Sequence, residues 1–217
     1  MKLFIDSGNI KDIETLVAIG IIDGVTTNPT LLAKEPGDYR ENLKKICQIV
    51  KGPVSGEVTA IDVAGMIAQG HDIAKIDEHM IVKVPLTRAG IQACKMLSDE
   101  GIRVNVTLCF SAAQALLAAK AGATYISPFV GRLDDIAMNG MDLIREIVDI
   151  YDNYEFKTEV LVASCRHPIH VVEAARMGAG IATCPPAVID QLFNHPLTNI
   201  GLEKFLKDWE KAQAVKA

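Results

Sequence analysis

The chain lacks several features that mark particular classes of protein. No run of about 18 apolar residues occurs in it, so we expect no membrane span. Strongly acidic or basic tracts are also absent, and the net charge of −5 is built from mixed charges, so we expect no nucleic-acid surface. A small anionic substrate would therefore require a local cluster of positive charge within a mildly acidic protein.

The chain also lacks the signs of a secreted, disulfide-bonded protein. It has five cysteines, an odd number, and no Cys-x-x-Cys pair. They are scattered along the sequence, at Cys47, Cys94, Cys109, Cys165 and Cys184. The first residues contain neither the long uncharged apolar run nor the small-residue cleavage site of a signal peptide. We therefore expect reduced thiols in a cytoplasmic protein.

Length and composition limit the number of domains. The 217 residues, of which 49% are apolar, can build one sizeable core, and a second full domain would be cramped. No linker, low-complexity segment or shift in composition interrupts the chain. We therefore expect residues 1–217 to form a single domain.

Short apolar runs alternate with amphipathic stretches along the whole chain. We expect strands at residues 2–6, 24–27, 54–58, 80–84, 103–107, 125–128, 159–164 and 180–183. We expect helices at residues 10–18, 39–50, 62–76, 89–100, 112–119, 140–152, 169–177 and 187–193, and an additional C-terminal helix at about 201–212. Strict alternation predicts a parallel sheet, and closing it gives an α/β fold, a (β/α)8 TIM barrel. A doubly wound open sheet is the alternative, because periodicity alone does not establish closure.

Glycines stand just after several predicted helices, where a residue in the left-handed conformation commonly ends a helix. They are Gly20, Gly52, Gly101, Gly122 and Gly178. This turn chemistry agrees with the predicted alternation of helices and strands.

The last predicted helix carries a single apolar stripe. The stripe consists of Leu202, Phe205, Leu206 and Trp209, the only tryptophan of the chain. We expect the stripe to cap the chain's own barrel, and a contact with a neighbouring subunit is the alternative.

Polar side chains stand where a buried parallel strand should be apolar. They occur at the carboxyl ends of seven predicted strands and include Asp6, the run 26–29, Glu57, Lys83, Asn105, Thr107, Ser127, Ser164 and Arg166. Side chains alternate along a strand, so Asn105 and Thr107 share a face, and Ser55 and Glu57 share another. Active sites of barrels form from inward-facing residues at this end, which favours a functional origin over an inert polar core.

Lys83 interrupts an otherwise apolar strand, Ile-Val-Lys-Val-Pro at 81–85. Lysine is rarely fully buried unless it is paired, and removal from water disfavours the ammonium form. A neutral amine can attack a carbonyl and form a Schiff base. A buried salt bridge with Asp6 or Glu57 is the structural alternative, and it is compatible with that chemistry.

Six motifs resemble the transaldolase family, in particular its short-chain branch, which includes fructose-6-phosphate aldolases. They are Phe-Ile-Asp-Ser at 4–7, Gly-Val-Thr-Thr-Asn-Pro-Thr-Leu at 24–31, Ile-Val-Lys-Val-Pro at 81–85, Asn-Val-Thr-Leu at 105–108, Ser-Pro-Phe-Val-Gly-Arg-Leu-Asp-Asp at 127–135 and Ala-Ser-Cys-Arg at 163–166. The match spans essentially the whole chain in the right order. It implies a (β/α)8 barrel enzyme of carbohydrate metabolism, in the pentose phosphate pathway, that needs no cofactor and no metal.

The resemblance also implies roles for individual residues. Lys83 matches the Schiff-base lysine, and Asp6 matches the acid/base that takes the proton of the substrate hydroxyl. Glu57 and Thr107 would hold the catalytic water. The remaining positions would bind substrate: Asn28 and Asn105 its hydroxyls, Arg132, Ser164 and Arg166 its phosphate, with Thr27, Ser127 and Phe129 lining the same pocket. Two arginines and a serine suit phosphate, because the guanidinium fork matches its oxygens.

Two positions bear on the branch of the family. Aldolase relatives carry Gln at the position of Glu57 and Tyr at the position of Phe129. Both differences favour transfer of a dihydroxyacetone unit from sedoheptulose 7-phosphate or fructose 6-phosphate to glyceraldehyde 3-phosphate or erythrose 4-phosphate. An aldolase that releases free dihydroxyacetone is the alternative, and a non-catalytic sugar-phosphate-binding barrel is an alternative of another class.

Other motifs carry less information. His167 and His170 have a spacing that would suit a metal-ligand pair, but no Asp/His cluster accompanies them, and we expect His170 to be a surface or interface residue. Gly178-Ala-Gly180 lacks the rest of a dinucleotide fingerprint and is interpreted as a turn. Small members of the resembled family form rings, often decamers, so a homo-oligomer is expected.

Overall fold

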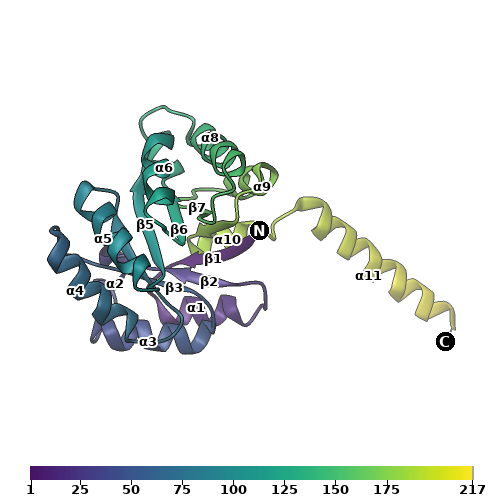
Figure 1. Cartoon of the computed structure of the whole chain (residues 1–217). Coiled ribbons are helices and arrows are strands. Elements are labelled where there is room, and N and C mark those ends of the chain that lie inside the picture. Colours follow the sequence, from purple (N-terminus) through teal and green to yellow (C-terminus); the bar gives the residue numbers. More distant parts are fainter. Residues whose placement is uncertain (217) are drawn as a thin grey trace.

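The strands close into a barrel in the computed structural model, which describes residues 1–216 (Figure 1). All neighbouring strands are parallel, in sequence order, and the last pairs with the first. The strands are β1 (Lys2–Asp6), β2 (Gly24–Thr26), β3 (Val54–Glu57), β4 (Met80–Pro85), β5 (Val104–Cys109), β6 (Tyr125–Pro128), β7 (Glu159–Val162) and β8 (Ile181–Cys184). The predicted (β/α)8 barrel is therefore confirmed, and the open sheet is excluded.

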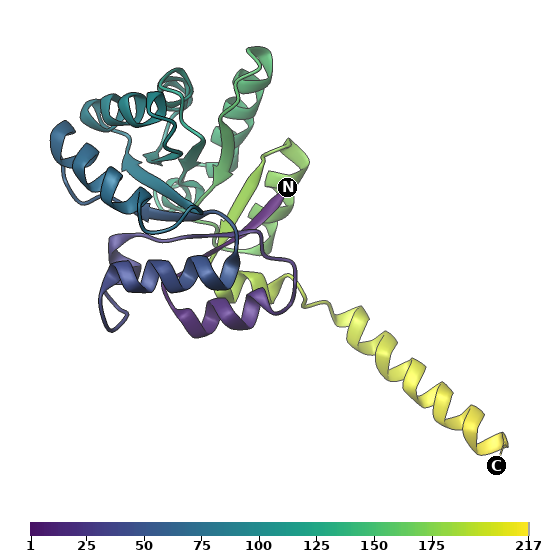
Figure 2. The ribbon, with the colours of Figure 1, turned by 60° about the horizontal axis from the view of Figure 1, so that its bottom comes forward.

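Helices surround this barrel (Figures 1 and 2). Those near the predicted positions are α1 (Ile10–Val17), α3 (Tyr39–Val50), α4 (Val63–Ala74), α5 (Arg88–Asp99), α6 (Ala112–Lys120), α8 (Gly140–Asn153), α9 (Pro168–Met177) and α10 (Pro186–Gln191). Two short helices that the periodicity did not predict, α2 (Pro29–Leu32) and α7 (Val130–Asp134), directly follow β2 and β6. Both lie at the carboxyl end of the barrel, where they carry residues of the candidate site.

Local chemistry explains most helix boundaries. Seven of the described helices begin at a residue whose side chain accepts a hydrogen bond from a backbone N–H of the first turn, which satisfies an otherwise unpaired donor. These residues are Asn9, Asn28, Asp38, Asp62, Thr87, Ser111 and Asn139. Four of the predicted left-handed glycines have positive φ, but Gly52 does not. The left-handed residue after α3 is Lys51, and a Cβ on Gly52 would lie 2.4 Å from the carbonyl oxygen of Asp23.

Alternation along the strands divides the barrel interior into layers. The floor is an apolar cluster that includes Phe4, Ile81, Tyr125, Leu161 and Ile181. Two residues further along the same strands lie Asp6, Lys83, Ser127, Ala163 and Thr183. Because residues i and i+2 point to the same side of a strand, this layer of mainly polar side chains stands directly on the apolar floor. The larger core between strands and helices is apolar.

The terminal helix α11 (Pro196–Lys216) is longer than predicted and does not cap the chain's own barrel. It leaves the barrel after α10 and extends away from it in both views (Figures 1 and 2). The stripe residues are exposed by 58% (Leu202), 72% (Phe205), 54% (Leu206) and 63% (Trp209). The expectation of a self-capping helix was therefore wrong: the link between α10 and α11 carries the helix outward, so its apolar stripe does not reach the barrel.

Residue 217, the last of the predicted single domain, lies outside the described residues. Within residues 1–216, no helix combines the length and apolar character needed to cross a membrane.

Candidate active site

A cleft opens at the carboxyl end of the barrel, where active sites of this fold form. It has two adjoining lobes, of about 180 and 440 Å³, which share the residues Asp6, Asn28, Lys83, Phe129 and Arg132. The first lobe adds Thr26, Ser127, Ala163, Ser164, Arg166 and Thr183. The second adds Pro29, Thr30, Leu31, Glu57, Thr107 and Leu108. Ten of the twelve predicted site residues therefore line one cleft, and Lys83 belongs to both lobes.

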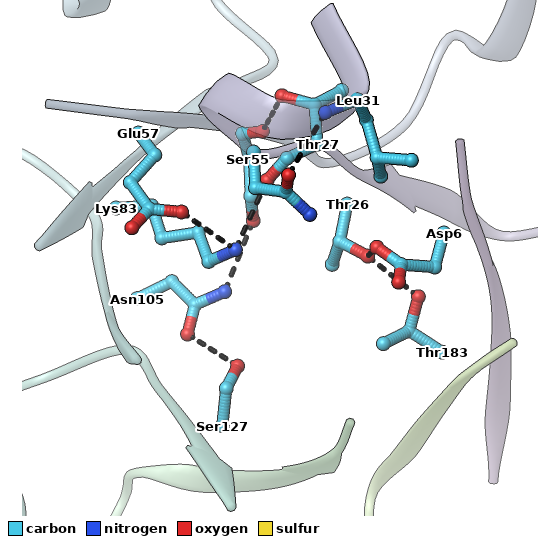
Figure 3. Close-up of polar contacts among 11 residues, drawn as sticks. Asp6, Thr26, Thr27, Leu31, Ser55, Glu57, Lys83, Asn105, Ser127 and Thr183 are labelled. Carbon is cyan, nitrogen blue, oxygen red and sulfur yellow. Dashed lines mark hydrogen bonds and ion pairs between the residues drawn. The ribbon is translucent and has the colours of Figure 1, made fainter. Parts of the chain in front are cut away.

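Lys83 lies on β4 and is only 4% exposed. Its Nζ lies 3.0 Å from Oε2 of Glu57 and donates a hydrogen bond to the backbone carbonyl oxygen of Thr27, also at 3.0 Å (Figure 3). Glu57 is its register partner on the adjacent strand β3. A buried amine with a carboxylate in contact can exchange a proton locally and still face the cleft, as a nucleophilic lysine requires.

Asp6 lies on the other side of the cleft (Figure 3). Thr26 donates a hydrogen bond to Asp6 Oδ1 at 2.8 Å, and the hydroxyls of Thr26 and Thr183 lie 2.7 Å apart. Burial raises the pKa of the Asp6 carboxyl, while the nearby charge of Lys83 and the Thr26 hydrogen bond act in the opposite direction. A carboxyl whose pKa is raised takes up a proton more readily than an ordinary one, as a general base requires.

The second lobe contains a hydroxyl that lacks a protein partner. Oγ1 of Thr107 is buried and has no hydrogen-bond partner within the described chain. It lines the same lobe as Glu57. The register of β5 shifts between Val106 and Cys109, and Leu108 has a φ of 59°, so Thr107 sits at an irregularity of its strand. Buried polar groups are nearly always paired, which makes this hydroxyl a position for a bound water or substrate oxygen.

Two predicted site residues do not line either lobe. The hydroxyl of Thr27 donates to the backbone oxygen of Ser55 at 2.7 Å, so its carbonyl, rather than its side chain, reaches Lys83. The amide of Asn105 donates to Ser55 Oγ at 3.2 Å and accepts from Ser127 Oγ at 2.7 Å. This buried network, visible in Figure 3, fixes Asn105, the register partner of Lys83 on β5, beside the lysine.

Positive charge gathers in the first lobe. Arg132, on α7, lies over the ring of Phe129 with its guanidinium carbon 4.9 Å from the ring centre. Arg166 follows β7, and its Nη2 lies 2.9 Å from Oδ2 of Asp135. Strand β7 ends at Val162, earlier than predicted, and Ser164 has a φ of 60°, so a left-handed turn and not the strand directs the segment that carries Ser164 and Arg166.

Sequence reasoning missed two residues and misplaced a third. Thr26 and Thr183 support Asp6, and the parity of β8, in which Thr183 follows Ile181 by two residues, could have identified Thr183. His170 was expected at the surface but is only 4% exposed, because it packs against Arg166 and Asp134. Among residues 1–216, no group of three or more His, Cys, Asp or Glu side chains could hold a metal ion.

Comparisons with known proteins agree with this geometry. The family model described as transaldolase/fructose-6-phosphate aldolase matches residues 3–216. A protein from Kosmotoga olearia, named a probable transaldolase, is 56% identical over 97% of each chain. Proteins with the same name from Anaeromyxobacter dehalogenans (59% identical, 97% of each chain) and Methanococcus vannielii (58% identical, 97% of this chain and 98% of the relative) are equally similar. The chain belongs to the transaldolase/fructose-6-phosphate aldolase family.

Proposed function

We propose that this chain is a transaldolase that moves a dihydroxyacetone unit between sugar phosphates through a Schiff base on Lys83. The single observation that supports this most strongly is the placement of the Lys83 amine, buried between the two lobes and in contact with Glu57. The shared name of the similar proteins from three genera favours transfer over an aldolase. Membership of a family of enzymes favours catalysis over a binding protein without activity.

In this mechanism the Lys83 amine attacks the ketose carbonyl after its ammonium has given up a proton, for which Glu57 is the nearest carboxylate at 3.0 Å. Loss of water from the carbinolamine gives the protonated imine. Glu57 and the unpaired hydroxyl of Thr107 would hold this water and return it at hydrolysis. The imine then accepts the electrons of the breaking carbon–carbon bond.

Asp6 takes the proton of the substrate hydroxyl as that bond breaks and returns it to the acceptor aldehyde in the reverse direction. Its raised pKa and the Thr26 hydrogen bond support this role. Asn28, on the rim of both lobes, would bind substrate hydroxyls. Asn105 and Ser127, which are hydrogen-bonded to each other, would support this binding from the polar layer of the barrel. Thr27 would contribute its backbone oxygen as a partner of Lys83.

The phosphate would bind in the first lobe, between Arg132 and Arg166, with Ser164 as a further partner. Guanidinium groups match phosphate oxygens in geometry and charge. Phe129 lines both lobes and has no hydroxyl, so it cannot position water for protonating the three-carbon unit as a tyrosine there could. The three-carbon imine would then persist until an aldose acceptor arrives.

We further propose the setting of the enzyme. It would act in the cytoplasm, in the pentose phosphate pathway, as one domain comprising the barrel and α11. The exposed apolar stripe of α11 supports assembly into a homo-oligomer. A ring, with a decamer as one form, is what the family resemblance implies for that assembly. Leu202 and Trp209 mark the two ends of this stripe.

Dependence on an acceptor tests transfer against release. With fructose 6-phosphate alone we expect only slow formation of free dihydroxyacetone, and rapid turnover once erythrose 4-phosphate is added. Lys83→Met should lower turnover by at least about 10³-fold, because it removes the nucleophile. Lys75→Met, at an exposed lysine after α4, is the control and should leave turnover unchanged. Rapid release without acceptor would establish the aldolase alternative.

Asp6→Asn separates stability from catalysis. We expect turnover to fall by roughly 10²–10⁴-fold, because the proton acceptor is lost. The melting temperature at pH 7 should rise, because a folded-state pKa above the ordinary 3.8 means that burial disfavours the carboxylate. This carboxyl favours the fold at low pH, and that contribution is lost as the pH rises through its folded pKa.

Thermal melts from pH 4 to pH 8 therefore should show the largest gain from Asp6→Asn at the high end. The control is Asp149→Asn at an exposed position of α8, which should alter neither turnover nor stability. A lower melting temperature for Asp6→Asn across the whole range would contradict the role of burial.

Light scattering after size exclusion tests the assembly. We expect an oligomer for the native chain and dissociation for the double variant Phe205→Glu, Trp209→Glu, because charges would replace the exposed rings. Lys204→Glu changes the charge of the same helix away from the stripe and should leave the mass unchanged. A monomeric native chain would refute the proposal.

A further inference from the structure

His170 is a buried histidine to which the proposed mechanism gives no part. It lies in the first turn of α9 and contacts two groups outside that helix. The backbone N–H of Arg166 donates to His170 Nδ1 at 3.2 Å, and His170 Nε2 lies 3.0 Å from Oδ2 of Asp134 on α7. One ring therefore joins the β7–α9 loop (residues 163–167) to α7.

These two contacts define the form of the ring. An N–H group points at Nδ1, so Nδ1 must offer its lone pair and carries no proton. The single ring proton then lies on Nε2 and is donated to Asp134. Only this neutral tautomer makes both hydrogen bonds. In a protonated ring the N–H at Nδ1 would face the backbone N–H of Arg166, and two donors would oppose each other.

The groups around the ring favour the neutral form. The charged or titratable groups that face it are His167 at its own helix end, Glu173 on the same helix and Asp134 on α7. Burial, followed by His167, lowers the pKa of His170, and the two carboxylates oppose this effect.

The same loop is tied to α7 at further points. The N–H of Gly131 donates to the carbonyl oxygen of Ser164 at 3.2 Å, and Nη2 of Arg166 pairs with Asp135 at 2.9 Å. A Cβ on Gly131 would lie 2.3 Å from that carbonyl oxygen and 2.5 Å from Nε of Arg166, so helix and loop touch with no room for a side chain.

The partner of His170 is itself fixed. Oδ1 of Asp134 accepts the N–H of Gly140 at the start of α8, at 2.9 Å. The loop also contains a non-glycine residue in the left-handed region, Ser164, a conformation that persists only where surrounding contacts impose it. The chain Gly140–Asp134–His170–Arg166 supplies one such set of contacts to the backbone of the proposed phosphate-binding residue.

We propose that the Asp134–His170 pair positions Arg166 for the phosphate group of the substrate, and so sets the preference for phosphorylated over unphosphorylated sugars. This inference rests on the proposed function, in which Arg166 binds phosphate. His170 is a positioning residue, because it reaches the ligand only through the backbone of Arg166. Loss of its hydrogen bonds weakens phosphate binding and leaves the chemistry at Lys83 intact.

The test compares glyceraldehyde 3-phosphate with glyceraldehyde as acceptors, at saturating donor. His170→Phe, which keeps an aromatic ring at this position and removes both hydrogen bonds, should raise KM for the phosphorylated acceptor about tenfold, the effect of one buried unpaired group. KM for glyceraldehyde and kcat for both should stay within about twofold. His170→Asn, whose amide oxygen can replace Nδ1 as acceptor for Arg166, should recover part of the loss.

The control is His71→Phe. His71 also pairs with a carboxylate, Glu100, at 2.6 Å, but on the outer surface of α4 and α5. This variant should change neither KM. Should His170→Phe fail to fold, His170→Gln, which retains a donor toward Asp134 and removes the acceptor for Arg166, carries the same expectation.

Arg166→Ala distinguishes a wrong phosphate site from a wrong positioning role for His170. It should raise KM for the phosphorylated acceptor more than His170→Phe does. If it leaves that KM unchanged, the proposed phosphate site is wrong. If Arg166→Ala has its effect and His170→Phe has none, or raises KM for both acceptors equally, the positioning role alone is overturned.

Acid pH provides a second readout. Inorganic sulfate keeps its charge between pH 5 and 8. Any change with pH in its inhibition constant against the phosphorylated acceptor therefore comes from groups of the protein. In the native enzyme this constant should rise as the pH falls toward about 5 and His170, whose pKa is lowered by burial, becomes protonated. The ratio of the constants for His170→Gln and native enzyme should shrink over the same range. A ratio independent of pH would contradict the inference.

Discussion

Lys83 places an amino group in the buried interior of the barrel, at the base of the cleft, and its contacts with Glu57 and with the carbonyl of Thr27 offset part of the cost of burying it. A lone buried ammonium is strongly unfavourable, whereas one with a carboxylate and a carbonyl as partners is not. The other features of the cleft follow from this requirement. The partner on β3, the acid on β1 and the unpaired hydroxyl of Thr107 all line the same lobe as the amine.

The polar layer of the barrel exists because of strand parity. An apolar floor built on Phe4, Ile81 and Tyr125 closes the barrel from below, and the residues two positions further along each strand form its polar upper layer. Gly24 contributes to this floor, since a Cβ there would lie 2.6 Å from the ring of Phe4. The lobes then divide the proposed work: proton and water handling near Glu57, and anion binding near Arg166.

Much of this arrangement could be predicted from the sequence, because it depends on periodicity. Alternation along β4 and β5 is a local property, so the inward direction of Lys83 and Thr107 follows from counting residues. Closure of the barrel was also predicted, although it needed the resemblance as well as the pattern. The predictions that were wrong concerned features that depend on contacts between distant segments of the chain.

Three residues illustrate this limit. Lys51 takes the left-handed conformation expected of Gly52. Gly52 answers a different requirement, because the backbone of Asp23 leaves no room for a side chain at position 52. His170 was expected at the surface or an interface because it stands at a helix start, and only the fold brings Asp134 against it. Trp209 was expected to pack on the barrel because it belongs to an apolar stripe, but it is exposed. Periodicity identifies the apolar face of a helix and does not identify the surface that covers it.

The central claim is that Lys83 carries the covalent intermediate. Sodium borohydride added together with fructose 6-phosphate reduces an imine to a stable amine, and mass spectrometry of the peptides then locates it. The account predicts a reduced three-carbon adduct on the peptide that contains Lys83, formed only when the sugar phosphate is present. An adduct on a different lysine, or none while transfer proceeds at its normal rate, would contradict it.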